Sequence, residues 1–419
     1  MDLNPVIIAI PMYFLLMGLE LAYESIKKTR TYRLSDAVTN ISTGTLQQVV
    51  GTFVAILKVG AYAWVFDRIA PFHIENGWLG FVVAMILWDL CYYWEHRMAH
   101  RVSLFWGGHV VHHQSEDYNL SVALRQTSTG FLWGIPFYLP MALLGVDPVS
   151  FVLAGGFNLL YQFWIHTEHI DKMPRWFEAV FNTPSHHRVH HGRNPKYIDK
   201  NYGGIFILWD RLFGTFREEE ERPHYGVTTP LRSYNPVFAN VTHYIDLWRL
   251  TRKSRSVGDT VKMLFKPPGW QPDYLGGPLL PPEVAPDYEK FSIRVDRRIN
   301  YYVIAQFFLL LGVASFYFFV GAKFPLELKI GFALWIIWST VMFGLLFEGR
   351  ERLTRWLEPL RLAVLPIGVW LLAADGLLPV LGFWIVLALS LISVIGFYRI
   401  RQLVFRARKQ SSTSMIGAV

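Results

Sequence analysis

Histidine is the residue type most able to do chemistry in this chain. There are 14 histidines, and eleven of them fall between His96 and His191. The densest stretch, residues 182–191, reads N-T-P-S-H-H-R-V-H-H, and His187, His190 and His191 form an H-x-x-H-H pattern within it. Helical side chains three and four positions apart share a face, and neutral imidazole is the commonest side-chain metal ligand near neutral pH. The pattern can therefore aim two or three imidazoles at one point.

Similar spacings occur twice upstream, as another H-x-x-H-H and an H-x-x-x-H, and one further histidine ends an apolar run. The nine expected ligands are His96, His100, His109, His112, His113, His166, His187, His190 and His191. Four to six ligands per ion are typical of first-row metals, so nine nitrogens predict two metal ions. Imidazole suits iron, zinc and copper alike, so the ligands alone leave the metal open.

Other side chains near the patterns have two interpretations each. His186 either binds metal or lies behind the ligands facing substrate, and His169 either extends the site from His166 or is a solvated residue at a helix end. Glu116 and Asp117 either orient ligating imidazoles through hydrogen bonds or cap a helix. The same choice holds for two carboxylates that flank ligands, Glu95 and Glu168. Three isolated histidines are expected to be ordinary surface or interfacial residues: His73, His224 and His243.

The composition is typical of an integral membrane protein rather than of two or three soluble domains. Residues are 52% hydrophobic and only 17% charged, and nine apolar runs approach or reach the length of a membrane span. We expect helices at about residues 5–23, 43–66, 78–94, 130–146, 149–165, 301–320, 328–347, 360–374 and 378–398. The fourth and fifth are short and could form a shallow hairpin. A single cysteine, Cys91, excludes an intrachain disulfide, a zinc ribbon and an iron–sulfur cluster.

The formal net charge of +8 is better explained by membrane topology than by a nucleic-acid partner. Basic residues gather at the ends of the apolar runs, and cytoplasmic loops are the ones that carry Lys and Arg. An outward N-terminus leaves only Arg68 and Lys323 as basic residues in outer loops. The same topology places all three histidine patterns on the cytoplasmic face.

These observations predict an all-α integral membrane protein with about nine transmembrane helices and a cytoplasmic, histidine-rich helical cap that holds a dimetal site. The expected parts are N-terminal spans (1–95), a catalytic region (96–220, with the hairpin at about 130–165), a Pro-rich connector (221–298) and C-terminal spans with a basic tail (299–419). A dimetal site fed by apolar helices fits lipid oxidation better than hydrolysis. Iron with dioxygen can cleave an unactivated C–H bond, and zinc cannot.

The motifs H-R-M-A-H, H-V-V-H-H and H-R-V-H-H resemble those of the fatty acid hydroxylase and sterol desaturase superfamily of membrane diiron proteins. Longer stretches are similar to one of its families, the alkylglycerol monooxygenases. They read S-E-D-Y-N-L-S-V-A-L-R-Q (115–126), N-L-L-Y-Q-F-W-I-H-T-E (158–168), N-T-P-S-H-H-R-V-H-H-G-R-N (182–194), I-D-K-N-Y-G-G (198–204) and P-P-G-W (267–270). The similarity is very specific from about residue 94 to 216 and loose after residue 281.

The resemblance implies hydroxylation, with O2, non-heme iron and tetrahydrobiopterin, of the carbon next to the ether oxygen of a glycerol ether lipid. The product would break down to a fatty aldehyde and a glycerol derivative. The eight histidines of the three motifs become iron ligands by this resemblance, and His166 matches a further family histidine. The membrane would be the endoplasmic reticulum in a eukaryote or the inner membrane in a bacterium.

Residues outside the ligand set are assigned by their nearness to the motifs. Candidate catalytic residues are Glu116, Asn119 and His186. Candidate pterin-binding residues are Glu116, Tyr118, Arg125 and Tyr202. The main alternative is a superfamily hydroxylase of fatty acyl chains, sterols or ornithine lipids that takes electrons from a ferredoxin or cytochrome. A membrane heme protein and a metal-dependent scaffold without turnover are alternatives from other classes.

Overall fold

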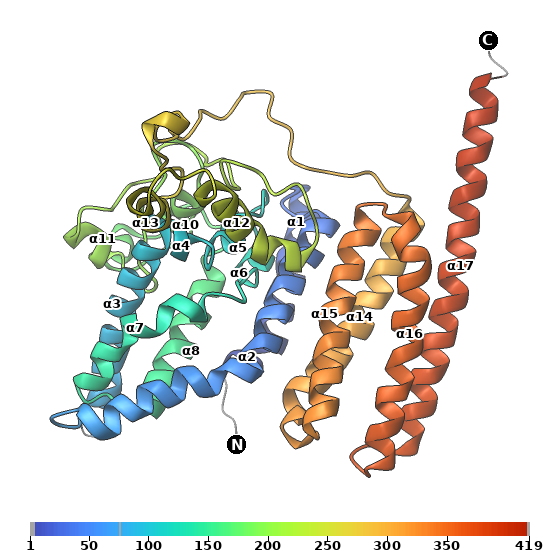
Figure 1. The fold of residues 1–419 in the computed structure, drawn as a ribbon, viewed down its shortest axis with the longest axis horizontal. Coiled ribbons are helices and arrows are strands. Elements are labelled where there is room, and N and C mark those ends of the chain that lie inside the picture. The colour runs from blue at the N-terminus through green and yellow to red at the C-terminus, as the bar shows by residue number, and fades with distance from the viewer. Residues whose placement is uncertain (1–4, 75–76, 417–419) are drawn as a thin grey trace. The chain divides into compact units, whose positions relative to one another are not determined.

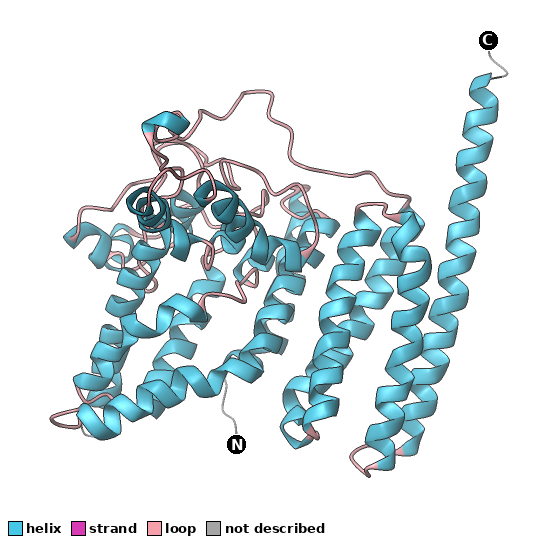
Figure 2. Ribbon diagram, viewed as in Figure 1, coloured by secondary structure: helices cyan, strands magenta, loops and turns pink. Residues whose placement is uncertain are grey.

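The computed structural model describes residues 5–74 and 77–416, and within them every named element is a helix (Figures 1 and 2). The all-α prediction is therefore confirmed. Two isolated antiparallel bridges, Phe181 with Phe206 and Gly192 with Tyr225, supplement the helices near the histidines. The chain divides into two compact units, one made of residues 1–232 and 238–291 and the other of residues 233–237 and 292–419.

The first unit contains thirteen α-helices, which vary from one turn to 36 residues. Its long helices are α1 (Pro5–Lys27), α2 (Leu34–Ile69), α3 (Trp78–Arg101), α7 (Phe131–Leu143) and α8 (Pro148–Trp164). Its short helices are α4 (Ser103–Trp106), α5 (Val110–His113), α6 (Leu120–Ala123), α9 (Arg175–Val180), α10 (Pro184–His191), α11 (Leu208–Leu212) and α13 (Val257–Phe265). Most of α12 (Pro236–Thr251) also belongs to it.

The second unit consists mainly of four long helices that run side by side (Figure 1). They are α14 (Arg297–Val320), α15 (Leu326–Phe347), α16 (Glu351–Ala374) and α17 (Val380–Ile416). A buried polar network joins them, because the Arg361 guanidinium bonds to Glu358 (2.6 Å), Gln306 (2.8 Å) and Ser339 (3.1 Å). Ser393 on α17 completes the network by accepting from Gln306 (2.9 Å).

Six described helices are long and apolar enough to cross a membrane, so the chain is an integral membrane protein. The spans are Ala9–Lys27, Leu34–Ile69, Arg297–Lys323, Leu326–Phe347, Glu351–Ala374 and Val380–Val404. The remaining three expected runs fall in α3, α7 and α8, which are more polar or shorter. Nine spans, the cytoplasmic cap and the four-part division of the chain stay predictions.

The apolar interior of the first unit is built by aromatic side chains from α2, α3, α7 and α8. Tyr62 stacks on Phe151 with ring centroids 4.1 Å apart, and its hydroxyl donates to the carbonyl of Val146 (2.8 Å). Trp88 and Tyr138 belong to the same cluster, and their ring centroids are 4.9 Å apart. Helix α8 begins sharply because Asp147 accepts hydrogen bonds from the first backbone N–H groups of the helix. These contacts fix α3 and α8, whose ends carry ligand histidines.

Polar residues of α8 point into the protein. Asn158 donates to the Asp89 carboxylate (2.5 Å) and accepts from Gln162 (2.5 Å). Asp89 also accepts from the backbone N–H groups of Ile205 (2.7 Å) and Phe206 (3.0 Å). Because a buried carboxylate with several donors holds them firmly, Asp89 ties the loop after residue 200 to helix α3.

Candidate metal centre

Nine histidines from four segments of the chain converge in the first unit. Two come from the C-terminal turns of α3, three from the end of the loop before α5 and α5 itself, one from the turn after α8, and three from α10. Eight of them are buried, and His109 is half-buried. Helix α10 can begin at residue 184 because Thr183 caps it, accepting from the backbone N–H of His186, and because proline suits the first helical position.

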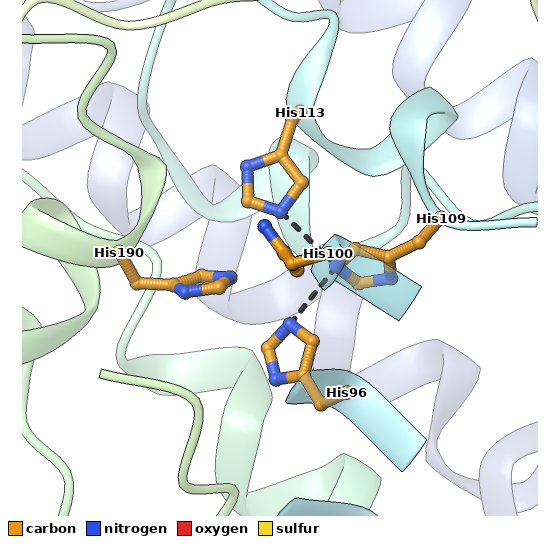
Figure 3. Close-up of side chains that lie close together, drawn as sticks. All are labelled: His96, His100, His109, His113 and His190. Atoms are coloured by element: carbon orange, nitrogen blue, oxygen red, sulfur yellow. Dashed lines mark hydrogen bonds between the residues drawn. The ribbon is translucent and has the colours of Figure 1, made fainter. Parts of the chain in front are cut away.

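The nine rings form two groups, and within each group the nearest ring nitrogens all lie within 4.8 Å of one another. The five-histidine group is His96, His100, His109, His113 and His190, whose rings point toward a common centre (Figure 3). The four-histidine group is His112, His166, His187 and His191. These nine are the ligands expected from the sequence, and His186 and His169 belong to neither group.

Each H-x-x-H-H motif serves both groups instead of aiming at one point. His109 and His113 join the five-histidine group, and the residue before the last, His112, turns to the other. In α10, His187 and His191 join the four-histidine group, while His190 turns to the five-histidine group. Adjacent helix positions point about 100° apart. His190 and His191 therefore face different groups, although both lie within about one turn of His187.

Backbone carbonyls fix the tautomer of four rings. The Nδ1–H groups donate as follows: His96 to Tyr202 (2.8 Å), His112 to Arg125 (2.9 Å), His166 to Gln162 (2.7 Å) and His190 to Lys200 (2.9 Å). A carbonyl oxygen only accepts, so Nδ1 carries the proton and Nε2 keeps its lone pair. Such bonds to the outer ring nitrogen orient ligating histidines in metalloproteins.

In the pair of His112 and His166, the inner nitrogens have no proton to share with each other. His112 Nε2 and His166 Nε2 lie 3.2 Å apart, and both rings carry their proton on Nδ1. Nε2 of His100 and of His190 is buried without any hydrogen-bond partner. Facing lone pairs repel, and a buried nitrogen without a partner costs free energy, whereas a cation would satisfy both. The donor set therefore fits a metal ion in each group.

The titration behaviour of the rings also fits metal binding. Burial, and then the neighbouring imidazoles, hold the pKa of His113, His187 and His191 well below the usual histidine range. Burial lowers the pKa of His112 to about 4. These imidazoles are neutral at pH 7, and only the neutral form can coordinate a metal.

A loop after α10 supplies two of the carbonyls that orient the rings, and two side chains hold that loop. Asp210 accepts from the backbone N–H groups of Tyr202 and Gly203, both at 2.7 Å. Asn201 donates to the carbonyl of His186 (3.0 Å) and adopts a left-handed backbone with φ of 55°. At Gly204 a Cβ would lie 2.6 Å from Asp89, so the close approach requires glycine.

Arg188, in the middle of the last histidine motif, holds α10 from the side away from the metal. Its buried guanidinium bonds to the Glu219 carboxylate (2.6 Å) and to the carbonyls of Ile170 (2.6 Å) and Asp171 (2.7 Å). Four residues that hold the site were not predicted from the sequence: Arg188, Asp89, Asn201 and Asp210. For Arg188, the available signal was its position inside a histidine motif. For the other three residues, nothing in the spacing indicated that they bond to distant parts of the chain.

Glu116 and Asp117 hold another segment of the chain, and their bonds go to described residues other than the grouped histidines. Glu116 accepts from the Tyr288 hydroxyl and from the backbone N–H of Phe291 (2.6 Å). Asp117 pairs with Arg33 (2.7 Å) and Lys290 (2.8 Å). We call residues 288–291 the strap, because it is fastened to the acidic pair that directly follows the second histidine motif.

Two other expected residues, Asn119 and Arg125, have structural contacts around the site. Asn119 caps α6 by accepting from the backbone N–H of Ser121 (3.1 Å). Arg125 donates to the carbonyl of Val111 (2.7 Å) and to Asn40 (3.0 Å), and it supplies the carbonyl that orients His112.

The rings of Tyr118 and Tyr202 lie beside the grouped histidines. The ring centroids are 5.7 Å apart for Tyr118 and His166, and 5.3 Å apart for Tyr202 and His100. The Tyr118 hydroxyl donates to the carbonyl of Ile165 (3.0 Å). His186 is buried next to the ligand groups, but its Nδ1 has no partner. Burial lowers the pKa of His186 to about 3.

The remaining histidines lie apart from the two groups. His169 is 3.6 Å from the carboxylate of Glu24, and His73 stacks on Phe66 at 4.3 Å. His243 is hydrogen-bonded to the carbonyl of Ser103 (2.7 Å). The carboxylates next to ligands turn to other partners: Glu95 accepts from Tyr138 (2.5 Å), and Glu168 accepts from Tyr225 and Arg222.

Comparison with known proteins agrees with the geometry. The fatty acid hydroxylase family model matches residues 81–215, which contain all nine grouped histidines. Human alkylglycerol monooxygenase is 39% identical over 312 residues, covering 73% of this chain and 69% of the human protein. The Xenopus tropicalis enzyme is 35% identical over 347 residues (81% and 76%), and rat lathosterol oxidase is 30% identical over 182 residues (40% and 57%). No solved structure matches. The chain therefore belongs to the alkylglycerol monooxygenase family and is a monooxygenase.

Proposed function

We propose that the protein hydroxylates the ether-linked carbon of alkylglycerol lipids with O2 and tetrahydrobiopterin at a centre of two non-heme iron ions. The observation that carries the proposal is the pair of adjoining all-nitrogen groups in a membrane protein. The stacked rings of His113 and His191, 4.5 Å apart, place one group directly beside the other. The names of the relatives support the substrate class.

The reaction balances with one pterin. O2 and two electrons from tetrahydrobiopterin, with two protons, convert the ether CH2 to a hydroxylated carbon and release one water. The C–O bond then breaks, and the hydroxyl hydrogen moves to the departing glycerol oxygen, which leaves a fatty aldehyde. The ether oxygen stabilises a radical or cation on its neighbouring carbon, so that C–H bond is the easiest in the lipid to break.

The protein would contribute position and protection. The five-histidine and four-histidine groups would each hold one iron, and the iron pair with O2 supplies the oxidising power for C–H cleavage. The carbonyls that orient His96, His112, His166 and His190 keep the lone pairs aimed inward before any ion arrives. Burial keeps bulk water away from the reacting carbon.

The substrate and the pterin would occupy different surroundings. The alkyl tail would lie among the apolar helices and the glycerol near the histidines, on the cytoplasmic face of the membrane. For the pterin we favour Tyr118 and Tyr202, whose rings lie against the ligands. Glu116 and Arg125 are weaker candidates because their side chains are bonded within the protein.

The test uses purified, iron-loaded protein in lipid nanodiscs with an alkylglycerol, with and without tetrahydrobiopterin. We expect about two iron ions per chain and fatty aldehyde only in the presence of pterin. Equal aldehyde formation with and without pterin would contradict tetrahydrobiopterin as the electron donor. No aldehyde at all would contradict hydroxylation of the ether-linked carbon. The second candidate is a superfamily hydroxylase of sterols with a protein electron donor, which the 30% identity to lathosterol oxidase supports. Incubation with a sterol and a reduced ferredoxin or cytochrome, followed by mass-spectrometric detection of oxidised sterol, tests it.

A further inference from the structure

An exposed face of helix α13 does not contribute to the metal centre. Val257, Val261 and Phe265 are spaced four residues apart and form one stripe along it, with exposed fractions of 82%, 48% and 52%. Met263, on the opposite side, is buried against the protein. An apolar stripe of this kind normally faces a core, but here the helix has already used another side for its packing.

The surroundings of this stripe are strongly basic. Between residues 249 and 266 there is one acidic residue, Asp259, and there are six exposed basic ones: Arg249, Arg252, Lys253, Arg255, Lys262 and Lys266. Around the helix, Lys262 and Lys266 follow directly after the apolar stripe, so the exposed face is apolar on one half and basic on the other. Asp259 is turned toward the protein, where it accepts from the Tyr274 hydroxyl (3.2 Å).

The C-terminal end of α13 lies beside the end of α3. The backbone N–H of Ser103, two residues after α3, donates to the carbonyl of Lys266 (2.9 Å). Figure 1 shows α13 nearly end-on, whereas α3 runs along the page, so the two axes cross. If α3 crosses the membrane, as its apolar run predicts, α13 lies parallel to the membrane surface at the exit of α3.

We propose that α13 is an interfacial helix that inserts Val257, Val261 and Phe265 into the headgroup region of an anionic leaflet. Helices with an apolar face beside a Lys/Arg-rich face lie in the membrane plane in this way, and clustered basic residues near a membrane helix are attracted by anionic lipids. The charge complementarity selects an anionic bilayer over an apolar protein partner. The proposal does not depend on which lipid the enzyme oxidises.

Depth measurement with a spin label tests the proposal on the full chain in nanodiscs. In a Cys91→Ala background, we compare a label at Val261→Cys with a matched label at Lys262→Cys, one residue along on the basic half. With anionic lipid present, the label at 261 should collide severalfold more with oxygen, relative to a water-soluble nickel reagent, than the label at 262. Uncharged lipid, or Lys253→Glu with Lys266→Glu, should reduce that ratio.

Three results would contradict the proposal. A label at 261 as accessible to nickel as one at 262, in anionic nanodiscs, would show that the face lies in water. A label shielded from both oxygen and nickel would show that protein, such as a second copy of the chain, covers it. If the ratio of oxygen to nickel collisions at 261 stayed high in uncharged lipid and with both lysines changed to glutamate, anionic lipid would have no role.

Discussion

His112 and His166 face each other with their Nε2 atoms 3.2 Å apart, although both rings have placed their proton on Nδ1. The carbonyls of Arg125 and Gln162 that hold those protons come from separate parts of the chain. The fold therefore forces two lone pairs together, an arrangement that is unfavourable for the protein alone. A cation between them would remove the repulsion. We therefore expect the stability of the first unit to depend on bound metal most strongly around the two histidine groups.

Two adjacent histidines of α10 give a matched test of metal binding. His187 Nε2 lies 3.0 Å from His166 Nε2, within the four-histidine group, whereas His186 belongs to neither group. We expect His187→Ala to lower monooxygenase activity by at least about 100-fold and to remove about one metal ion per chain, since the loss of even a residue that supports a ligand costs 10–100-fold. His186→Ala should keep both ions. Metal analysis and aldehyde detection provide the measurements, and equal metal loss in the two variants would contradict the assignment.

Asp210 should act on the five-histidine group without touching it. Its carboxylate holds the backbone of Tyr202, whose carbonyl orients His96. In Asp210→Asn, one oxygen becomes an NH2 group that faces backbone donors, so the loop should loosen and affinity for one metal ion should fall by about 10–100-fold. Metal titration of the apoprotein, with exposed Asp246→Asn as control, measures this. Unchanged affinity for both ions would show that the loop is held by other contacts.

Glu116 has two interpretations that a second variant can separate. If its role is to fasten the strap, Glu116→Gln and Tyr288→Phe should both speed trypsin cleavage after Lys290 and leave the KM for the pterin unchanged. The reason is that both remove one contact between the acidic pair and the strap. If Glu116 binds the pterin instead, Glu116→Gln should raise that KM and Tyr288→Phe should not.

The metal-free protein should lose stability in acid. The pKa of His112 is about 4 in the fold, against an ordinary value of about 6.5 in the unfolded chain. Between these values the unfolded chain binds more protons, so the free energy of unfolding falls as pH falls. Burial raises the pKa of Asp210 to about 6, and a buried carboxyl of this kind acts in the opposite sense. The buried imidazoles, His113, His187 and His191 among them, are more numerous than such carboxyls, so the imidazoles decide the direction.

The thermal unfolding midpoint of chelator-treated protein should therefore be highest near about pH 7.5 and fall steadily toward about pH 5. A midpoint that is flat or rises over this range would show that the imidazoles are protonated within the fold. Restoring the metal before heating is the control, because bound metal competes with protons for the same nitrogens.

The sequence predicted which histidines come together because their spacing is local. His187, His190 and His191 lie within one turn or so of a helix, and apolar runs of nearly twenty residues have few alternatives to a membrane helix. It did not predict how each motif divides between the two histidine groups, because that depends on how α5 and α10 are turned against each other. It also missed Asp89 and Arg188, whose partners lie 116 and 31 residues away.

Glu116 is a residue that the sequence associated with the site but that the fold uses elsewhere. Its place beside the second motif indicated a role at the metal, but its carboxylate is taken by residues 172 and 175 positions further along the chain. Local patterns identify which residues can do chemistry, whereas long-range packing decides which of them face the reacting atoms.

The second unit should depend on a buried ion pair in α16. Glu358 and Arg361 are fully buried, and their side chains lie 2.6 Å apart. Arg361→Met leaves the Glu358 carboxylate without its cation, which should cost about 3–5 kcal/mol, whereas replacing both residues removes the unpaired charge and should recover much of that loss. Thermal unfolding of the full chain in detergent compares Arg361→Met with the double variant Glu358→Leu and Arg361→Met. If the double variant is no more stable than the single one, the bonds of Arg361 to Gln306 and Ser339, rather than the ion pair, hold the four helices together.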